Sequence, residues 1–304
     1  MSDFTQKESH CELQFRSLGD IYHLWTPENH EIIFTCETDF RMGMNIIGVA
    51  AKLFPDIRIL TFEIMTNHLH IAAAAEKECL LSMFDSIKLM LARWLKAIGR
   101  ENPLKSFRAN VRHLDSLGDI RNVIAYDNRN GFLVNPDYSP FTYPWGANRY
   151  YFSPDTYRLA QLQSCNIGLR ERRQISHSRI ADRVEGLCSF DGCALPLSFC
   201  DIHSGESLFR DASHYFNKIS KNIESNAAIA KEIGESVWYT DDELYSIVLK
   251  LCRNRYMVES PKLLEAERKI ELARSLHFEY NAGAKQIRRM LVVDSSILKA
   301  IGIT

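Results

Sequence analysis

Two apolar runs separated by a two-residue turn constrain the fold of this chain more than any other feature. Residues 57–65 are rich in Ile, Leu and Phe, and residues 68–75 continue after Thr66-Asn67 as a second apolar run. Short apolar runs bounded by turn residues are typical of β-strands, and two of them around a tight turn predict a β-hairpin. We expect this hairpin to belong to a largely buried sheet.

Strand-like and helix-like patterns alternate on both sides of the hairpin up to about residue 145. Further strands are expected at residues 21–26 and 106–114. Helices are expected at residues 38–53, 78–98 and 116–130, the last closed by a glycine at the C-cap position. This succession predicts an α+β fold, in which helices pack on a small antiparallel sheet.

The sequence changes character after the first domain. Residues 135–154 are dense in proline and aromatic residues and indicate a loop. Helices are expected near the C-terminus at residues 262–278, 284–291 and 295–301. The last two resemble a helix-turn-helix, with a small helical cap on the core as the alternative. We expect three segments, namely a first domain at 1–145, a helical extension at 146–260 and a helix-turn-helix-like segment at 261–304.

Composition favours a soluble globular protein, since 46% of the 304 residues are hydrophobic and 25% are charged. No run approaches the roughly 18 apolar residues of a membrane span, and the polar first residues show no signal region. We therefore expect no membrane partner and a cytoplasmic location. The eight cysteines are scattered without a CxxC pair, which favours reduced core residues over a metal cluster.

His68 and His70 stand two residues apart on the second strand of the expected hairpin. Residues i and i+2 of a strand point to the same face, so the two imidazoles are placed to share one metal ion. The apolar residues around them put both rings on a buried strand. Two ordinary core or surface histidines are the alternative, because isolated His-x-His pairs are common.

Tyr126 lies late in the helix expected at 116–130, and Asn130 follows four residues later. Residues four apart share one helical face, so the phenol and the amide point in a common direction. Together with the imidazole pair they would supply a nucleophile and a third metal ligand. The alternative is a structural tyrosine that packs its ring and hydrogen-bonds its hydroxyl.

The stretch from about residue 15 to residue 145 resembles the REP-associated tyrosine transposases, which belong to the HUH endonuclease superfamily. Four strings carry the resemblance, in the family's order and spacing. The family's Tyr-His pair, Met-Pro-Asn-His-x-His, Tyr-x-x-x-Asn-Pro and Tyr-Pro-Trp-Ser-Ser correspond here to Tyr22-His23, Met65–His70, Tyr126–Gly131 and Tyr143–Ala147. Thr66 and Gly131 stand where the family has prolines, and both changes loosen the local backbone without removing a reactive group.

The resemblance implies a ferredoxin-like nuclease core and a DNA transposition or recombination enzyme that cuts and rejoins single-stranded DNA. In such enzymes a tyrosine attacks a phosphodiester and forms a 5′-phosphotyrosine link, a role that falls on Tyr126. His68, His70 and Asn130 would hold a divalent metal ion, Mg²⁺ or Mn²⁺. The implied partner is single-stranded or hairpin DNA, and the protein would be a monomer or a homodimer.

The formal net charge of −1 argues against indiscriminate binding to duplex DNA, which needs a basic surface, but it allows a local basic groove. Tyr143 and Trp145 are candidate stacking surfaces for bases, with core packing as the alternative. The candidate cationic contacts to DNA are Arg108, Arg112, Arg129, Arg149, Lys285, Arg288 and Arg289.

Two other functions remain open at this point. The near-neutral charge and the helix-turn-helix-like tail also fit a DNA-binding regulator that kept the scaffold and lost the chemistry. The histidine pair also fits an unrelated metal-dependent hydrolase.

Overall fold

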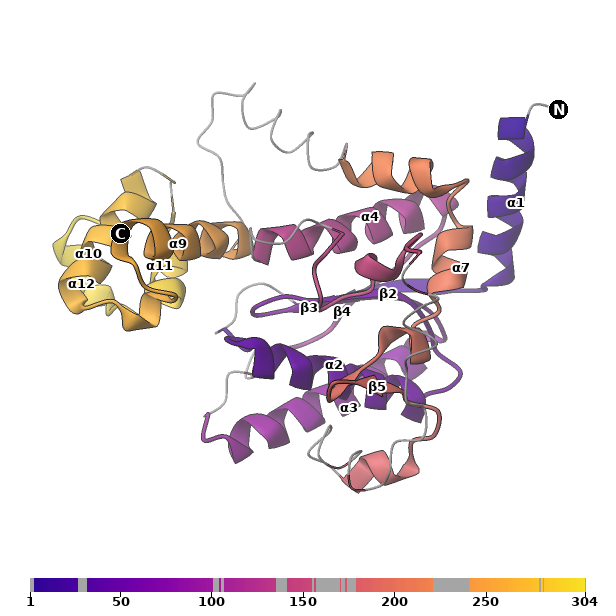
Figure 1. Ribbon diagram of the computed structural model, residues 1–304, viewed down its shortest axis with the longest axis horizontal. Helices are drawn as coiled ribbons and strands as arrows, with labels where there is room; N and C mark the ends of the chain where they lie inside the picture. The colour runs from indigo at the N-terminus through magenta and orange to yellow at the C-terminus, as the bar shows by residue number, and fades with distance from the viewer. Residues whose placement is uncertain are drawn as a thin grey trace. The chain divides into compact units, whose positions relative to one another are not determined.

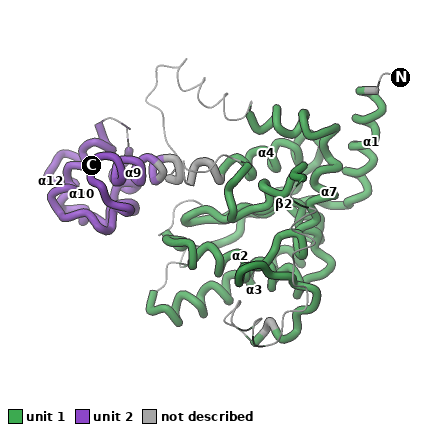
Figure 2. The backbone as a smooth tube through the Cα atoms, in the orientation of Figure 1, with its two compact units in different colours: residues 1–131, 140–222 green, residues 132–139, 223–304 purple. Residues whose placement is uncertain are grey.

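The computed structural model describes residues 3–26, 32–100, 107–134, 141–154, 179–220, 241–278 and 282–303, together with the single residues 104, 156, 170, 173 and 280. The chain forms two compact units, residues 1–131 with 140–222 and residues 132–139 with 223–304 (Figure 2). The predicted segment limits at residues 145 and 260 stay predictions. Part of the expected helical extension, including residues 157–169 and 221–240, lies outside the described residues.

A four-stranded antiparallel sheet forms the centre of the first unit (Figure 1). Its strands are β1 (Ile21–Trp25), β2 (Arg58–Ile64), β3 (Leu69–Ala74) and β4 (Asn110–His113), arranged in the order β2-β3-β1-β4. The expected hairpin is therefore β2-β3, and β3 lies between β2 and β1. The predicted α+β class, with helices packed on an antiparallel sheet, is confirmed.

Helices cover both faces of this sheet. The helices α2 (Glu37–Leu53) and α3 (Lys77–Ala97) pack together on one face, and α4 (Leu117–Val134) lies across the other (Figure 1). All six residues of β3 are buried, which explains why the sequence shows continuous apolar runs and not a strict apolar-polar alternation. The expected end of α4 at Gly131 is wrong: the helix continues to Val134, because glycine accepts a helical as well as a C-cap backbone.

The turn between β2 and β3 is held by backbone contacts from outside the hairpin. The Thr66 carbonyl accepts hydrogen bonds from the amides of Ile33 and Phe34, both at 2.8 Å. The Arg100 guanidinium donates to the Ile33 carbonyl at 2.7 Å and so fixes the segment that rests on the turn. These contacts restrain the backbone at Thr66 and so offset the loosening expected from threonine in place of proline.

Residues 145–147 extend the sheet beyond β2. The Ile64 amide donates to the Trp145 carbonyl at 2.9 Å, and the Ala147 amide donates to the Phe62 carbonyl at 3.0 Å. An isolated antiparallel bridge joins Glu63 to Gly146 between these two bonds. This part of the expected loop is therefore an ordered edge, whereas residues 135–140 lie outside the described residues.

The rest of the first unit surrounds this core. Besides the helix α1 (Asp3–Ser17), it consists of short elements that include a small β-hairpin, so the expected extension is not helical throughout. The bounds of these elements are η1 (Asn148–Tyr150), η2 (Arg179–Arg183), β5 (Ser189–Phe190), β6 (Cys193–Ala194), η3 (Pro196–Ser198), α7 (Ile202–Ser207) and a helical segment at 212–220.

The second unit contains only helices among its described residues. They are α9 (Asp241–Tyr256), η4 (Pro261–Leu263), α10 (Ala266–Phe278), α11 (Ala284–Leu291) and α12 (Ser295–Ala300). The three helices expected near the C-terminus are present, and a left-handed Val292 turns the chain between α11 and α12. The DNA-binding role of this helix pair stays a prediction.

Six of the described cysteines are free thiols. Cys188 is an exception, because it takes part in a disulfide, which corrects the expectation of reduced thiols for this residue. No helix among the described residues is long and apolar enough to cross a membrane.

Gly205 in α7 tests the packing between the extension and the sheet. A Cβ at this position would lie 2.0 Å from the Tyr151 hydroxyl, which donates to the Leu60 carbonyl at 2.6 Å. Gly205→Ala should therefore lower the free energy of unfolding by about 1–3 kcal/mol in urea titrations. Gly118→Ala in α4 is the control, because its Cβ would meet no atom closer than 3.6 Å. Equal stability of the two variants would contradict this packing.

Candidate functional site

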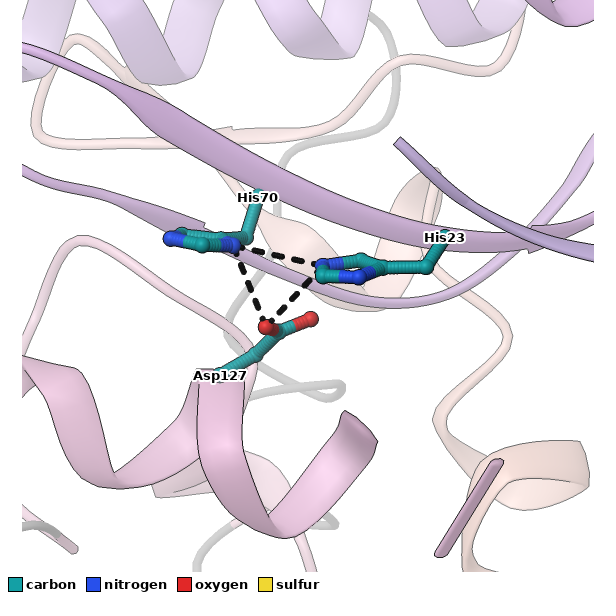
Figure 3. Close-up of side chains that lie close together, drawn as sticks. All are labelled: His23, His70 and Asp127. Atoms are coloured by element: carbon teal, nitrogen blue, oxygen red, sulfur yellow. Dashed lines mark hydrogen bonds and ion pairs between the residues drawn. The ribbon is translucent and has the colours of Figure 1, made fainter. Parts of the chain in front are cut away.

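The candidate site lies between the sheet and α4. His23 on β1 and His70 on β3 both point toward the helix, and Asp127 points back from α4 (Figure 3). Strand alternation explains the shared face, since His70 pairs with Trp25, and residues 23 and 25 of one strand face the same way. Residues far apart in the sequence are thereby brought to one point.

The three side chains form a nearly regular triangle. His23 Nε2 lies 3.2 Å from His70 Nδ1, and Asp127 Oδ1 lies 3.2 Å from each of these nitrogens. Ligand atoms about 2.1 Å from one ion, at tetrahedral or octahedral angles, lie about 3.0–3.4 Å apart. The group can therefore hold a metal ion without large rearrangement.

The electrostatics of Asp127 also favour a cation. The side chain is fully buried, and burial alone raises the pKa of its carboxyl; the charges of His23 and His70 outweigh that effect and hold the pKa below its ordinary value. Apart from the contacts of Oδ1 with the two imidazoles, neither carboxylate oxygen has a hydrogen-bond partner among the described residues. A buried carboxylate of this kind is unfavourable unless a positive charge compensates it, and either an imidazolium or a metal ion can do so.

His68 lies beside this triangle and outside it. Its ring meets the ring of His70 edge-on, with centroids 4.9 Å apart, and its Nδ1 lies 2.8 Å from the Asn67 side-chain oxygen. Asn130 is buried on α4, one turn after Tyr126. The predicted ligand set of His68, His70 and Asn130 stays a prediction, and it shares only His70 with the group that the structure brings together.

Tyr126 contacts the same histidine from the solvent side. Its ring meets the His70 ring edge-on at a centroid distance of 5.9 Å, and the side chain is 36% exposed. The Arg129 guanidinium lies 4.9 Å from the Tyr126 ring centroid. A partly accessible phenol therefore lies next to both a buried acid-imidazole group and a positive charge, a setting that suits attack on an anionic substrate.

The predicted DNA contacts in the first unit occupy different settings. Arg112 on β4 pairs with His23 across the sheet and forms an ion pair with Asp119 at 3.2 Å. Arg108 and Arg149 are exposed, whereas Arg129 is buried against Tyr126. In the second unit, Lys285 and Arg288 are exposed on α11, and Arg289 is partly buried.

Of the two candidate stacking residues, Tyr143 packs inside the protein and Trp145 is partly buried. Tyr143 is buried, and its hydroxyl donates to the Ile64 carbonyl at 2.7 Å. Trp145 stacks on Phe40 of α2 with ring centroids 5.5 Å apart. Tyr143 is therefore a core residue, which was the alternative to base stacking.

Sequence reasoning assigned no role to His23 or Asp127. His23 appeared only within the Tyr-His pair, and Asp127 stands directly after the candidate nucleophile Tyr126. The available signal was the alternation of β1, which puts His23 on one face of a buried strand. The signal for Asp127 was a charged residue at a position that a buried helix face would normally fill with an apolar one.

Glu63 is a second acid that the sequence left unassigned. It is fully buried on β2 and pairs directly with His70 on β3. A Cβ on Gly146 would lie 1.9 Å from a Glu63 carboxylate oxygen. The absence of a side chain at Gly146 therefore makes room for this carboxylate.

No family model matches the chain, and no curated protein or solved structure does so either. Function is therefore inferred from the geometry of the site.

A thermal-shift series tests the metal centre. Mn²⁺ at about 100 times its Kd should stabilise the wild-type protein by about 2.7 kcal/mol, because an ion that binds only the folded state shifts the folding equilibrium. Asp127→Asn should abolish most of this stabilisation. Asp119→Asn, on the same helix but partly exposed to solvent beside Arg112, should retain it. A shift of equal size in both variants would exclude Asp127 as a ligand.

Proposed function

We propose that this chain is a metal-dependent single-stranded DNA endonuclease and strand transferase of the REP-associated tyrosine transposase type, with Tyr126 as the nucleophile. One observation carries the proposal: a partly exposed tyrosine lies edge-on to His70, which belongs to a buried group able to hold a metal ion. The proposed nucleophile on α4 and the candidate metal ligands on β1, β3 and α4 therefore lie together around His70.

The topology of the first unit supports the same proposal. Residues 21–113 follow the order β1-α2-β2-β3-α3-β4, and the antiparallel strands lie in the order β2-β3-β1-β4. This succession supports a ferredoxin-like core, which is the core that the resemblance implies. The candidate nucleophile then comes from α4, the helix that follows this core and lies on its open face.

The proposed reaction is a transesterification. The Tyr126 oxygen attacks the scissile phosphorus, the bond to the 3′ oxygen breaks, and a 5′-phosphotyrosine forms. The phenol releases its proton to water, and the departing 3′ oxygen takes up a proton to become a hydroxyl. One ester replaces another, so the reverse attack can rejoin DNA without a nucleotide cofactor.

The residues around Tyr126 divide the work. A divalent ion, when bound, supplies Lewis-acid polarisation of the phosphate and charge stabilisation of the leaving oxygen. His23, His70 and Asp127 would hold that ion, with His23 Nε2, His70 Nδ1 and Asp127 Oδ1 as the candidate ligand atoms. Arg129 stabilises negative charge on the phenol oxygen, which matters because a free tyrosine titrates only near pH 10.

Oligonucleotide cleavage by Tyr126→Phe tests the proposal. The variant should bind a single-stranded hairpin substrate as tightly as wild type but form no covalent protein–DNA adduct on denaturing gels, because the attacking oxygen is gone. Tyr22→Phe is the matched control: Tyr22 precedes His23 on β1 and points to the opposite face, toward His113. It should form the adduct at the wild-type rate.

Other outcomes identify the rival functions. Tight DNA binding without an adduct, even for wild type with Mn²⁺, would indicate a regulator that has lost the chemistry. Metal-dependent cleavage that survives Tyr126→Phe would indicate a hydrolase that uses activated water. Either result would overturn the transferase proposal.

The basic face of α11 is proposed as a second DNA-binding surface, which would neutralise phosphates. Replacing Lys285, Arg288 and Arg289 by alanine should weaken binding similarly for all sequences. The slope of log K against log salt should shrink by about 0.7 for each phosphate of single-stranded DNA that the variant leaves without a cationic partner. Lys262→Ala, an exposed cation of η4 in the same unit, should leave the slope unchanged. An unchanged slope in the triple variant would remove α11 from the interface.

A further inference from the structure

A closed circuit of hydrogen bonds holds α4 at the residue after Asp127. The Asn128 side-chain nitrogen donates to the Tyr215 hydroxyl at 2.8 Å, and that hydroxyl donates to the Asn148 side-chain oxygen. The Asn148 side-chain nitrogen then donates back to the Asn128 backbone carbonyl at 2.8 Å. The circuit therefore runs from α4 to Tyr215, on to Asn148 and back to α4. Both of these residues come after the four-stranded sheet in the sequence.

The sheet holds the same amide from its other side. The Thr61 hydroxyl on β2 donates to the Asn128 side-chain oxygen at 2.6 Å. Thr61, Asn128, Asn148 and Tyr215 are all buried, with 0–1% of each residue exposed. Burial also raises the pKa of the Tyr215 hydroxyl well above its ordinary value, so this group remains a proton donor at neutral pH. Each buried polar group thus depends on the others for its hydrogen bond.

The position of Asn128 within α4 gives this circuit a consequence for the site. Successive helical residues point about 100° apart, so Asn128 faces β2 while Asp127 faces β1 and β3. A roll of α4 by about 20° would move a side-chain end that lies about 5–6 Å from the helix axis by about 2 Å. Such a displacement would break the 3.2 Å contacts of Asp127 with both imidazoles and move Tyr126 relative to His70.

We infer that Asn148 and Tyr215 are positioning residues, which act through Asn128 to set the rotation of α4 and so aim Tyr126 and Asp127 at His70. The part of this inference that concerns kcat for adduct formation rests on the proposed function. It assigns a role to chain beyond residue 145, the region that the family resemblance does not cover. Substrate is not touched by either residue in this scheme.

Tyr215→Phe removes the hydroxyl and keeps the ring, which stacks on Tyr151 with centroids 5.1 Å apart. Tyr151→Phe is the matched control, because it also loses one buried hydroxyl from this aromatic pair. The Tyr151 hydroxyl donates to the Leu60 carbonyl and also meets the Thr61 side chain, both on β2, so its loss leaves the bonds from Tyr215 and Asn148 to α4 in place. Both variants should therefore lose comparable thermal stability, while only Tyr215→Phe should disturb the site.

Two readouts separate positioning from general destabilisation. For Tyr215→Phe, kcat for adduct formation should fall about ten- to a hundred-fold with KM for the oligonucleotide unchanged, since a misplacement of about 1 Å can have this effect. Its Mn²⁺ affinity, measured by titration of the folded protein, should fall at least three-fold. Tyr151→Phe should stay within two-fold of wild type in both measurements.

A second variant keeps the inference testable if Tyr215→Phe does not fold. Thr61→Val removes the hydroxyl that bonds the same amide from β2 and preserves the shape of the side chain, so it should reproduce both losses. Equal effects in Tyr215→Phe and Tyr151→Phe, or wild-type Mn²⁺ affinity and kcat in Tyr215→Phe, would overturn the inference. Absence of cleavage by wild type would instead reject the proposed function, while the comparison of Mn²⁺ affinities would still test the positioning role.

Discussion

The carboxylate of Asp127, buried between two imidazoles, is the constraint on which the rest of the site depends. Removing such a charge from water costs several kcal/mol unless it is compensated, and His23 and His70 are the partners at 3.2 Å. The compensation requires β1, β3 and α4 to meet at one place. Since Tyr126 precedes Asp127 on the helix, the same requirement brings the phenol to the edge of His70.

Contacts both inside and outside the stretch that resembles the transposases hold β1, β3 and α4 together at the site. Backbone donors on the Thr66 carbonyl fix the turn before His68, and the circuit through Asn148 and Tyr215 fixes the helix. At the edge of the sheet, Gly146 has no side chain, and this leaves room for the buried carboxylate of Glu63, which pairs with His70.

Local sequence patterns predicted most of the central secondary-structure elements but only a small part of the candidate site. The hairpin, the antiparallel sheet and the helices α2, α3 and α4 follow from periodicity and turn residues, and they are present in the structure, whereas α1 was not predicted. The pairing of Trp25 with His70 depends on strand register, and the rotation of α4 depends on partners up to 87 residues away. Neither is encoded in a local pattern, so His23 and Asp127 escaped notice, and the family assignment itself stays a prediction.

Anomalous diffraction from crystals grown with Mn²⁺ would test the central claim most directly. We expect one strong peak within about 2.2 Å of His23 Nε2, His70 Nδ1 and Asp127 Oδ1, with the Tyr126 hydroxyl turned toward it. A peak held instead by His68 and Asn130, or an imidazole pair joined only by a hydrogen bond in the presence of saturating Mn²⁺, would contradict the account.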